Sequence, residues 1–324
     1  MVGLVVSLGL AFGFLNGVND SGSLAAAMIC SGAAGPRRAL MLTAGAQLVG
    51  ALTVGVAVAR TIGQGIVDSR MISTRVVAAA LIGAISWGIV SWYLGLPSSS
   101  SHALIGALVG AVWLQSGPGA IRLQGLGTVL LVLFLAPWVG FVVTFVLMRL
   151  LLLALRGATP RAGGYLRRMQ WLLAPVVAAG HGANDSQKVM GVVALGLVSL
   201  GVLPSFSIPS WVKLAAALSL SAGTCVGGLR VMRTMGLRLY RIRSIHGFAS
   251  LAATIVVVMT ASLLGAPVST TQIIGAGIAG AGSAERFSKV RWGVIGNIVV
   301  AWLLTIPAAG SLAAIVYWTL YRYV

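Results

Sequence analysis

Two acidic residues of this chain lie where acids are rarely found. The 324 residues include only four acids, and Asp20 and Asp185 interrupt apolar stretches in the motifs "NGVNDSGS" and "GHGANDSQKVMG". The other two, Asp68 and Glu285, lie among basic residues in expected loops. An acid at the centre of a bilayer costs about 2.5–3.5 kcal/mol on insertion scales, so such residues usually line a cavity and mark an ion path.

An asparagine precedes each of these two acids. Asn19 and Asn184 place a neutral amide oxygen beside the carboxylates of Asp20 and Asp185, a combination that suits a small hard cation. The two motifs therefore predict two similar cation sites. The alternative is that each acid only caps a helix that starts after its motif.

Two Pro-Ser/Thr runs, "LPSSSSHALIG" and "APVSTTQIIG", suggest an anion site. Pro97 and Pro267 cannot continue a helix, and the hydroxyls follow where a new helix begins, beside free backbone N–H groups. Clustered hydroxyls at a helix N-terminus suit an oxyanion. The candidate substrate-binding residues are Ser99, Ser100, Ser101, Ser269, Thr270, Thr271 and, shortly after Asp185, Gln187. Simple helix capping and small-residue helix contacts are the alternatives.

Three further residues are candidates for accessory roles. Lys188 is the only basic residue in either acidic motif, and we expect it to neutralise substrate charge, to pair with Asp185 or only to extend to the interface. His102 follows the first serine run, and His181 precedes the second acid. His102 is expected to cap the following helix or to donate to the substrate, and His181 to take part in a proton step or only to hydrogen-bond a carbonyl.

The composition places these residues in a membrane protein. The chain is 58% hydrophobic and 8% charged, with a mean hydropathy of +1.01, and apolar stretches recur along its whole length. The 22 basic residues give a net charge of +18, but most lie in gaps between apolar stretches. Positive loops on the cytoplasmic side explain them better than a nucleic-acid partner. The chain has no Walker A, CxxC or HExxH pattern, which argues against an ATP-driven pump or a metalloenzyme.

The motifs also indicate an internal repeat. The two acidic motifs and the two Pro-Ser/Thr runs occur in the same order and at similar intervals, which predicts a duplicated unit. We expect a first membrane repeat at 1–152, a basic cytoplasmic linker at 153–168 and a second membrane repeat at 169–324. Each repeat is expected to contain a helix broken around its acidic motif.

The basic loops predict how the repeats are oriented. Cytoplasmic loops are expected around Arg37, between the repeats, at Arg230–Arg243 and around Arg286. All four loops lie on the cytoplasmic side of the membrane if residues 76–117 and residues 246–283 each form a re-entrant hairpin, with tips at Pro97 and Pro267. The loop around Pro204 then lies outside, so the repeats are inverted. The fold expected is an all-α integral membrane protein with two inverted-topology repeats, broken helices and re-entrant helical hairpins. Arg60, Arg70 and Arg75 do not fit this scheme, since they would lie outside.

The same residues resemble the signatures of the inorganic phosphate transporter family, PiT. "HGANDSQKVMG" is similar to its second-half signature, and "NGVNDSGSLAAAM" resembles the first more loosely. The resemblance implies ion sites at Asn19, Asp20, Asn184 and Asp185, with Na+ as a candidate ion at the two acids. It also implies phosphate contacts at Gln187 and the two hydroxyl runs. Where the family usually has an asparagine after its first acid, this chain has Ser23, so an amide ligand becomes a hydroxyl. Gln272 stands where the second hairpin often has histidine.

The expected function is secondary active import of inorganic phosphate, coupled to Na+ or H+, across a bacterial cytoplasmic membrane. The resemblance includes metal-phosphate complexes among the substrates, leaves a homodimer open and implies no further cofactor. A sulfate or other oxyanion permease of the same fold is the first alternative. Carboxylates favour phosphate, because protonated phosphate donates hydrogen bonds whereas sulfate only accepts them. An ion channel and a membrane enzyme acting on lipid phosphates are the alternatives from other classes.

Overall fold

The computed structural model describes residues 1–68, 71–159, 161–227 and 242–323. These residues form a helical bundle in which no regular strand is found, apart from one isolated bridge between Val67 and Ile121. The helices are α1 (Val2–Cys30), α2 (Pro36–Thr53), α3 (Ala57–Arg60) with a π-helical turn (Thr61–Gly65), α4 (Thr74–Leu94), α5 (Ser100–Ser116), α6 (Leu123–Ala154), α7 (Arg161–Ser199), α8 (Ser210–Val226), α10 (Ser244–Leu263), α11 (Thr270–Glu285) and α12 (Trp292–Tyr323).

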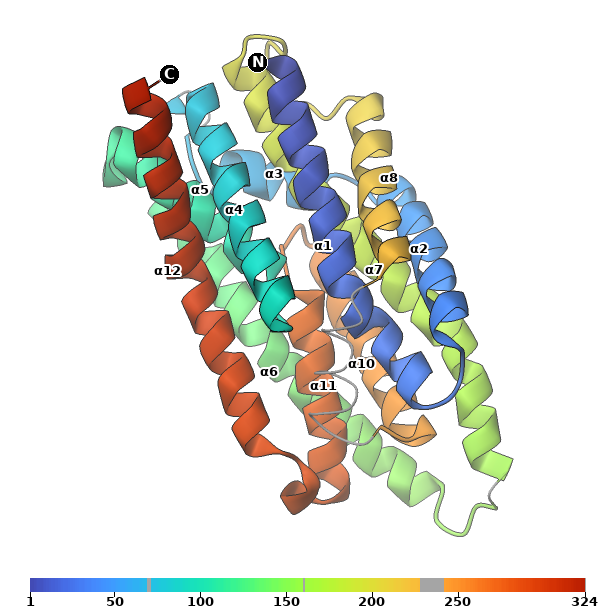
Figure 1. The fold of residues 1–324 in the computed structure, drawn as a ribbon. Coiled ribbons are helices and arrows are strands. Elements are labelled where there is room, and N and C mark those ends of the chain that lie inside the picture. Colours follow the sequence, from blue (N-terminus) through green and yellow to red (C-terminus); the bar gives the residue numbers. More distant parts are fainter. Residues whose placement is uncertain (69–70, 160, 228–241, 324) are drawn as a thin grey trace.

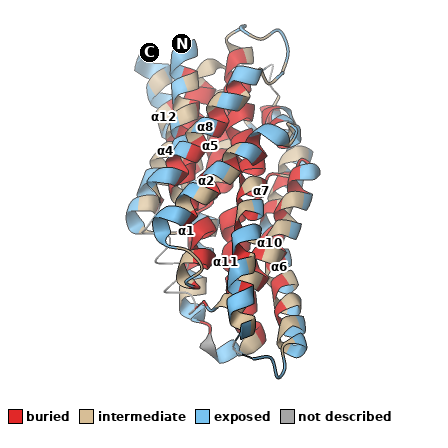
Figure 2. Ribbon diagram, turned by 90° about the vertical axis from the view of Figure 1, so that its right-hand side faces the viewer, coloured by how far each residue is buried: buried red, intermediate tan, exposed pale blue. Residues whose placement is uncertain are grey.

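The bundle has the dimensions and surface of a membrane protein. Five described helices, α1, α4, α6, α10 and α12, are long and apolar enough to cross a bilayer, and α2 with the helical segment after it bends by 72°. Large apolar side chains such as Leu131, Trp138 and Leu150 are exposed on the outside. Figure 2 shows the buried residues between the helices. An apolar exterior around a close-packed interior is what a lipid environment requires.

The expected helix breaks at the two acidic motifs are wrong. α1 continues through Asp20, and α7 continues through Asp185 for 39 residues in all. The serines that follow the acids bond back into their own helices, Ser21 to the carbonyl of Val18 and Ser186 to the carbonyl of Gly182. Such back-bonding lets a hydroxyl lie inside a helix without ending it. The backbone carbonyls near the acids are therefore not freed for a cation.

The chain breaks instead at the two proline runs, as expected. α4 ends at Gly95 in the left-handed conformation, and α5 begins after Ser99. In the second half, α10 ends before Gly265, and α11 begins after Ser269. The first turn of α5 meets the segment that links α10 to α11 inside the protein, where the Ser101 hydroxyl donates to the carbonyl of Val268 at 2.9 Å. The helical hairpins therefore bring both hydroxyl runs to one place.

The two halves are interleaved rather than separate. α1 packs on α8 and α7 on α2, while α5 packs on α12 and α11 on α6. Each of these contacts joins one half to the other. Because α1, α2, α5 and α6 correspond to α7, α8, α11 and α12, the α1–α8 contact is the counterpart of α7–α2, and the α5–α12 contact is the counterpart of α11–α6. Figure 1 shows α1 and α6 running from top to bottom, and α7 and α12 running from bottom to top. Opposite directions of matched helices are those expected of inverted repeats.

The polar connections divide between the ends of the bundle. The connections α1–α2, α6–α7 and α11–α12 lie toward the lower end in Figure 1, whereas the α7–α8 connection and both termini lie at the upper end. The lower connections carry Arg37, Arg156 and Arg286, as the topology predicts. Most of the expected loop at Arg230–Arg243 lies outside the described residues, as does Arg70. α6 ends at Ala154 and α7 begins at Arg161, so both helices extend into the expected linker 153–168.

Candidate functional site

α1 and α7 cross where their acidic motifs lie, and each helix binds the acid of the other. The Asn16 amide donates to Asp185 Oδ2 at 2.9 Å, and His181 Nε2 lies 3.1 Å from Asp20 Oδ2. Asn16 precedes Asp20 by four residues, as His181 precedes Asp185, so the two contacts are counterparts in the repeat. All four side chains are buried. The crossing thus joins two carboxylates that lie far apart in the sequence.

His181 lies between the two acids. Its Nε2 atom is 3.1 Å from Asp20 Oδ2 and 3.5 Å from Asp185 Oδ2. On the other edge of the ring, the Gln47 amide nitrogen is 2.9 Å from Nδ1, and Gln47 Oε1 accepts from the Thr224 hydroxyl at 2.7 Å. α2 and α8 therefore fix the ring through Gln47 and Thr224. Neither of these two residues was predicted from the sequence.

One ligand atom from each of Asp20, His181 and Asp185 lies within 4.8 Å of the others. That spacing and the carboxylate oxygens would suit a bound cation. The three residues come from the predicted ion and accessory sets, which the fold brings together.

The hydroxyl runs reach this cluster from both hairpins. Ser100 Oγ lies 3.3 Å from Asp185 Oδ2, and the Thr271 hydroxyl donates to Asp20 Oδ1. Ser101 and Thr271 are the equivalent positions of the two runs, and both are buried. Ser99 and Ser269 instead cap α5 and α11, accepting from the backbone N–H of His102 and Gln272. Capping and contact with the acids are thus divided between neighbouring hydroxyls.

Lys188 is fully buried, although it carries a charge. Its ammonium lies 2.6 Å from Asp185 Oδ1, 2.5 Å from Ser101 Oγ and 2.9 Å from the carbonyl oxygen of Val268. Three acceptors therefore match the three N–H donors of the ammonium. Of the three roles considered, the structure shows the pairing with Asp185, and the alternative in which Lys188 extends to the interface is wrong. Lys188 joins α7 to both hairpins at once.

Gln187 is held by its carbonyl oxygen, which leaves its amide nitrogen free. Its Oε1 atom accepts from the backbone N–H groups of Val58 at 2.8 Å and Ala59 at 3.3 Å, at the start of α3. Its amide nitrogen is buried and has no hydrogen-bond partner. The nitrogen is a donor, so it is the end of this side chain that an anion would use.

The two motif asparagines do not join the acidic cluster. Asn184 donates to the carbonyl of Ala266 at 3.0 Å and accepts from the N–H of Val268 at 3.2 Å, so it holds the second hairpin link. Asn19 donates to the carbonyl of Gly88 on α4 at 3.2 Å, and its own oxygen is buried without a partner. Both amides contact backbone rather than the neighbouring carboxylate.

The remaining candidates lie around the hairpin starts and on α1. His102 Nδ1 is 2.7 Å from Ser99 Oγ, and the His102 ring meets Phe134 edge-on. Thr270 Oγ1 and Ser23 Oγ are buried and lack hydrogen-bond partners. Neither hydroxyl therefore stabilises the fold through a hydrogen bond to the protein.

A small cavity of about 10 Å³ adjoins the cluster between α1, α4 and the start of α5. Polar side chains of Asn16, Asn19, Ser98 and Ser100 line it, and the amide oxygens of Asn16 and Asn19 have no partner. A volume of that order holds about one water-sized particle. The cavity is too small for a tetrahedral oxyanion. Such an anion could bind here only if the hydroxyls of the hairpin starts gave up their present hydrogen bonds and turned toward it.

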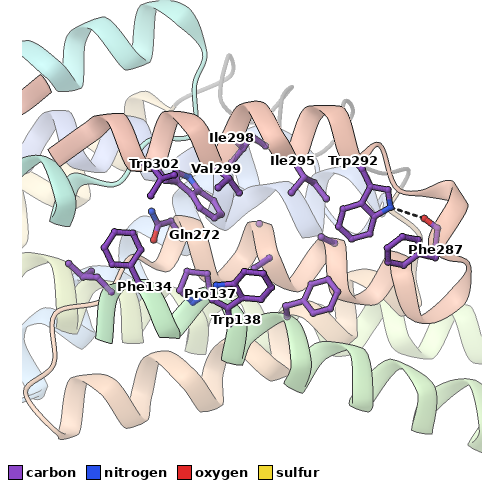
Figure 3. A pocket seen from close by; sticks show the side chains of 16 residues that line it. Phe134, Pro137, Trp138, Gln272, Phe287, Trp292, Ile295, Ile298, Val299 and Trp302 are labelled. Atoms are coloured by element: carbon purple, nitrogen blue, oxygen red, sulfur yellow. Dashed lines mark hydrogen bonds between the residues drawn. The ribbon is translucent and has the colours of Figure 1, made fainter. Parts of the chain in front are cut away.

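A larger groove of about 370 Å³ lies between α6, α11 and α12 (Figure 3). Its lining is aromatic and aliphatic, and includes Phe134, Trp138, Trp292 and Trp302. Trp138 is 70% exposed, so the groove opens toward the lipid. Gln272, at the position where the resemblance expects histidine, is its one amide. Without clustered donors or charges, this groove does not suit an oxyanion.

The comparisons with known proteins agree with this fold and cluster. A profile described as the phosphate transporter family matches residues 16–313. The chain is 39% identical over 319 residues to the "Probable low-affinity inorganic phosphate transporter" of Rhizobium meliloti, covering 98% of this chain and 95% of that protein. It is 35% identical over 321 residues to the protein of the same description from Bacillus subtilis, covering 98% and 96%.

A solved structure described as "The sodium-dependent phosphate transporter" superposes with a TM-score of 0.92, covering 100% of this chain and 99% of that one. Its sequence identity is 24%, so it supports the fold alone. The family consists of transporters rather than enzymes, and the apolar helices make this chain a multi-pass membrane protein. The expected resemblance is confirmed: this chain belongs to the phosphate transporter family.

Proposed function

We propose that the chain is a secondary active transporter that imports inorganic phosphate together with Na+ or H+. The observation that carries the proposal is the buried cluster of Asp20, His181, Asp185 and Lys188, which both hairpin starts contact. Buried ionisable groups in a membrane bundle usually mark a substrate or ion pathway. Family membership supports phosphate as the anion.

The substrate is proposed to bind where the two hairpins meet. Hydroxyls of Ser100, Ser101 and Thr271 would turn from the acids and from the Val268 carbonyl toward the anion, joined by the free amide nitrogen of Gln187. A protonated phosphate would in turn donate to a carboxylate, which sulfate cannot do. The interleaved halves, residues 1–152 and 169–324, would rock against each other to expose this place alternately to each side.

Uptake into proteoliposomes tests the proposal. The purified full chain is expected to accumulate radiolabelled phosphate under an imposed Na+ or H+ gradient, and excess sulfate is expected not to compete. Gradient-independent, non-saturating flux would indicate a channel instead. Accumulation of labelled sulfate without phosphate uptake would replace the substrate while keeping the mechanism.

Asp20→Asn tests the role of the cluster. The amide keeps the size of the side chain and still accepts from Thr271, but it removes the charge that a coupling cation would need. Gradient-driven uptake is expected to be lost, while the protein still elutes as folded material. Asp68→Asn is the control, because Asp68 lies at the surface 3.9 Å from Arg122 and outside the cluster. Normal coupled uptake by Asp20→Asn would refute the assignment.

A further inference from the structure

The ammonium of Lys188 lies in an oxygen shell of the kind that binds a small hard cation. One carboxylate, one hydroxyl and one backbone carbonyl surround it, contributed by Asp185, Ser101 and Val268. Hard metal ions take the same three kinds of oxygen ligand. The three oxygens come from α7 and from both hairpins, which are the elements that a coupling ion would need to hold together.

The matched position in the first half has no such charge. Ser23 follows Asp20 by three residues, as Lys188 follows Asp185, and residues three apart on a helix are neighbours. Ser23 is fully buried, and its hydroxyl has no hydrogen-bond partner. The acids of the two halves are therefore surrounded differently, although the helices that carry them are counterparts in the repeat.

We propose that Lys188 is a tethered cation that permanently fills the second-half ion site, so that only the site at Asp20 takes up a mobile cation. The inference rests on the proposed function, because it concerns the ions that accompany the substrate. It replaces the expectation of two similar cation sites. A lysine that served only to attract phosphate would not need to engage Asp185, a carbonyl and a hydroxyl with all of its donors.

The proposal predicts what happens when the ammonium is removed. Asp185 is 1% exposed, and a buried carboxylate left without its partner strongly destabilises a protein. In Lys188→Asn, the carboxylate and the other two oxygens remain, and the new amide adds a fourth oxygen at the vacated position. Na+ is then expected to bind there and to restore the lost stability.

The test is the melting temperature of the purified full chain in detergent, titrated with NaCl against choline chloride at constant ionic strength. Each cation that binds only the folded state adds its own dependence on Na+ concentration. Lys188→Asn is expected to melt lower than wild type in choline and to gain one additional Na+-dependent step. Lys213→Asn, which removes a half-buried lysine on α8 away from the cluster, is expected to keep the wild-type Na+ dependence. Equal loss of stability in both salts, or an unchanged Na+ dependence, would overturn the proposal.

Lys188→Gln, closer to lysine in volume, is purified in parallel in case the first variant does not fold. Recovery of either variant in Na+ but not in choline would support the proposal, and failure of both in each salt would refute it. Transport gives an independent readout. The reaction order with which the rate of phosphate uptake depends on Na+ concentration is expected to rise by about one in Lys188→Asn, because one additional Na+ would bind. If wild type does not carry phosphate, the proposed function fails, while the melting experiment still decides whether Lys188 replaces a cation.

Discussion

Thr271 shows how a single hydroxyl links the two halves at the site. It belongs to the second hairpin and donates to Asp20 on α1, a residue 251 positions away in the sequence. Thr271→Val keeps the shape but leaves that carboxylate oxygen without its donor, which costs about 1–3 kcal/mol for a buried group. The melting temperature is expected to fall by several degrees, and Thr271→Ser is expected to stay close to wild type. Equal melting of the valine and serine variants would show that the hydrogen bond is not made.

The rarity of charge is what made the residues of the cluster predictable. Asp20, Asp185 and Lys188 stand out because apolar sequence surrounds them, and a buried charge needs a reason. Gln47 carries no such signal, since a single glutamine in an apolar helix is compatible with many positions. Asn16 could have been predicted from the repeat, because it precedes Asp20 by four residues, as His181 precedes Asp185. The roles given to these side chains in ion or substrate binding stay predictions.

At the scale of elements, glycines set how closely the crossing helices approach. A side-chain carbon at Gly50 on α2 would come within 3 Å of the Ala179 backbone on α7, and one at Gly182 would meet the Gln47 backbone equally closely. Gly17 and Gly223 make the same kind of contact between α1 and α8. The small residues therefore place Gln47 against His181 by letting the helix backbones touch.

Gly50→Ala is expected to separate α2 from α7 and so to lower both the melting temperature and phosphate uptake. Gly45→Ala on the same helix is the matched control, because nothing lies within 4 Å of an added carbon there. That variant is expected to be neutral or slightly more stable, since alanine favours a helix by about 1 kcal/mol over glycine. The prediction fails if the two alanine variants melt and transport alike.

Sequence patterns predicted the elements unevenly, and the reason is local chemistry. Pro97 and Pro267 end helices because proline removes a donor and clashes with the preceding turn, so the hairpin tips were predictable. The two acidic motifs also look capable of ending a helix, but their polar side chains hydrogen-bond to other helices or back into their own turn. A helix can therefore pass through them unbroken. Which partner a polar side chain meets depends on the packing of distant segments and cannot be predicted from the motif.

At the scale of the whole molecule, the exchange of contacts between the halves argues for one cooperative bundle. α5 packs on α12 and α11 on α6, so each half would lose these contacts if the other were removed. The acids are also paired across the halves. A movement of one half against the other would then change the contacts of both acids together, which is how the proposed coupling of ion and substrate would arise.

The alternating access that we propose between inverted halves requires that matched connections face opposite sides of the membrane. The α1–α2 and α7–α8 connections occupy corresponding places in the two halves, and they lie toward opposite ends of the bundle in Figure 1. With the native Cys30 and Cys225 replaced by alanine, we expect Ser205→Cys to react with a membrane-impermeant maleimide in intact cells. Gly163→Cys, near the basic connection between the halves, is expected to react only after permeabilisation. Labelling of both from the same side would refute the inverted arrangement, whereas the reverse pattern would keep it and turn the whole protein over in the membrane, against the positive-inside rule.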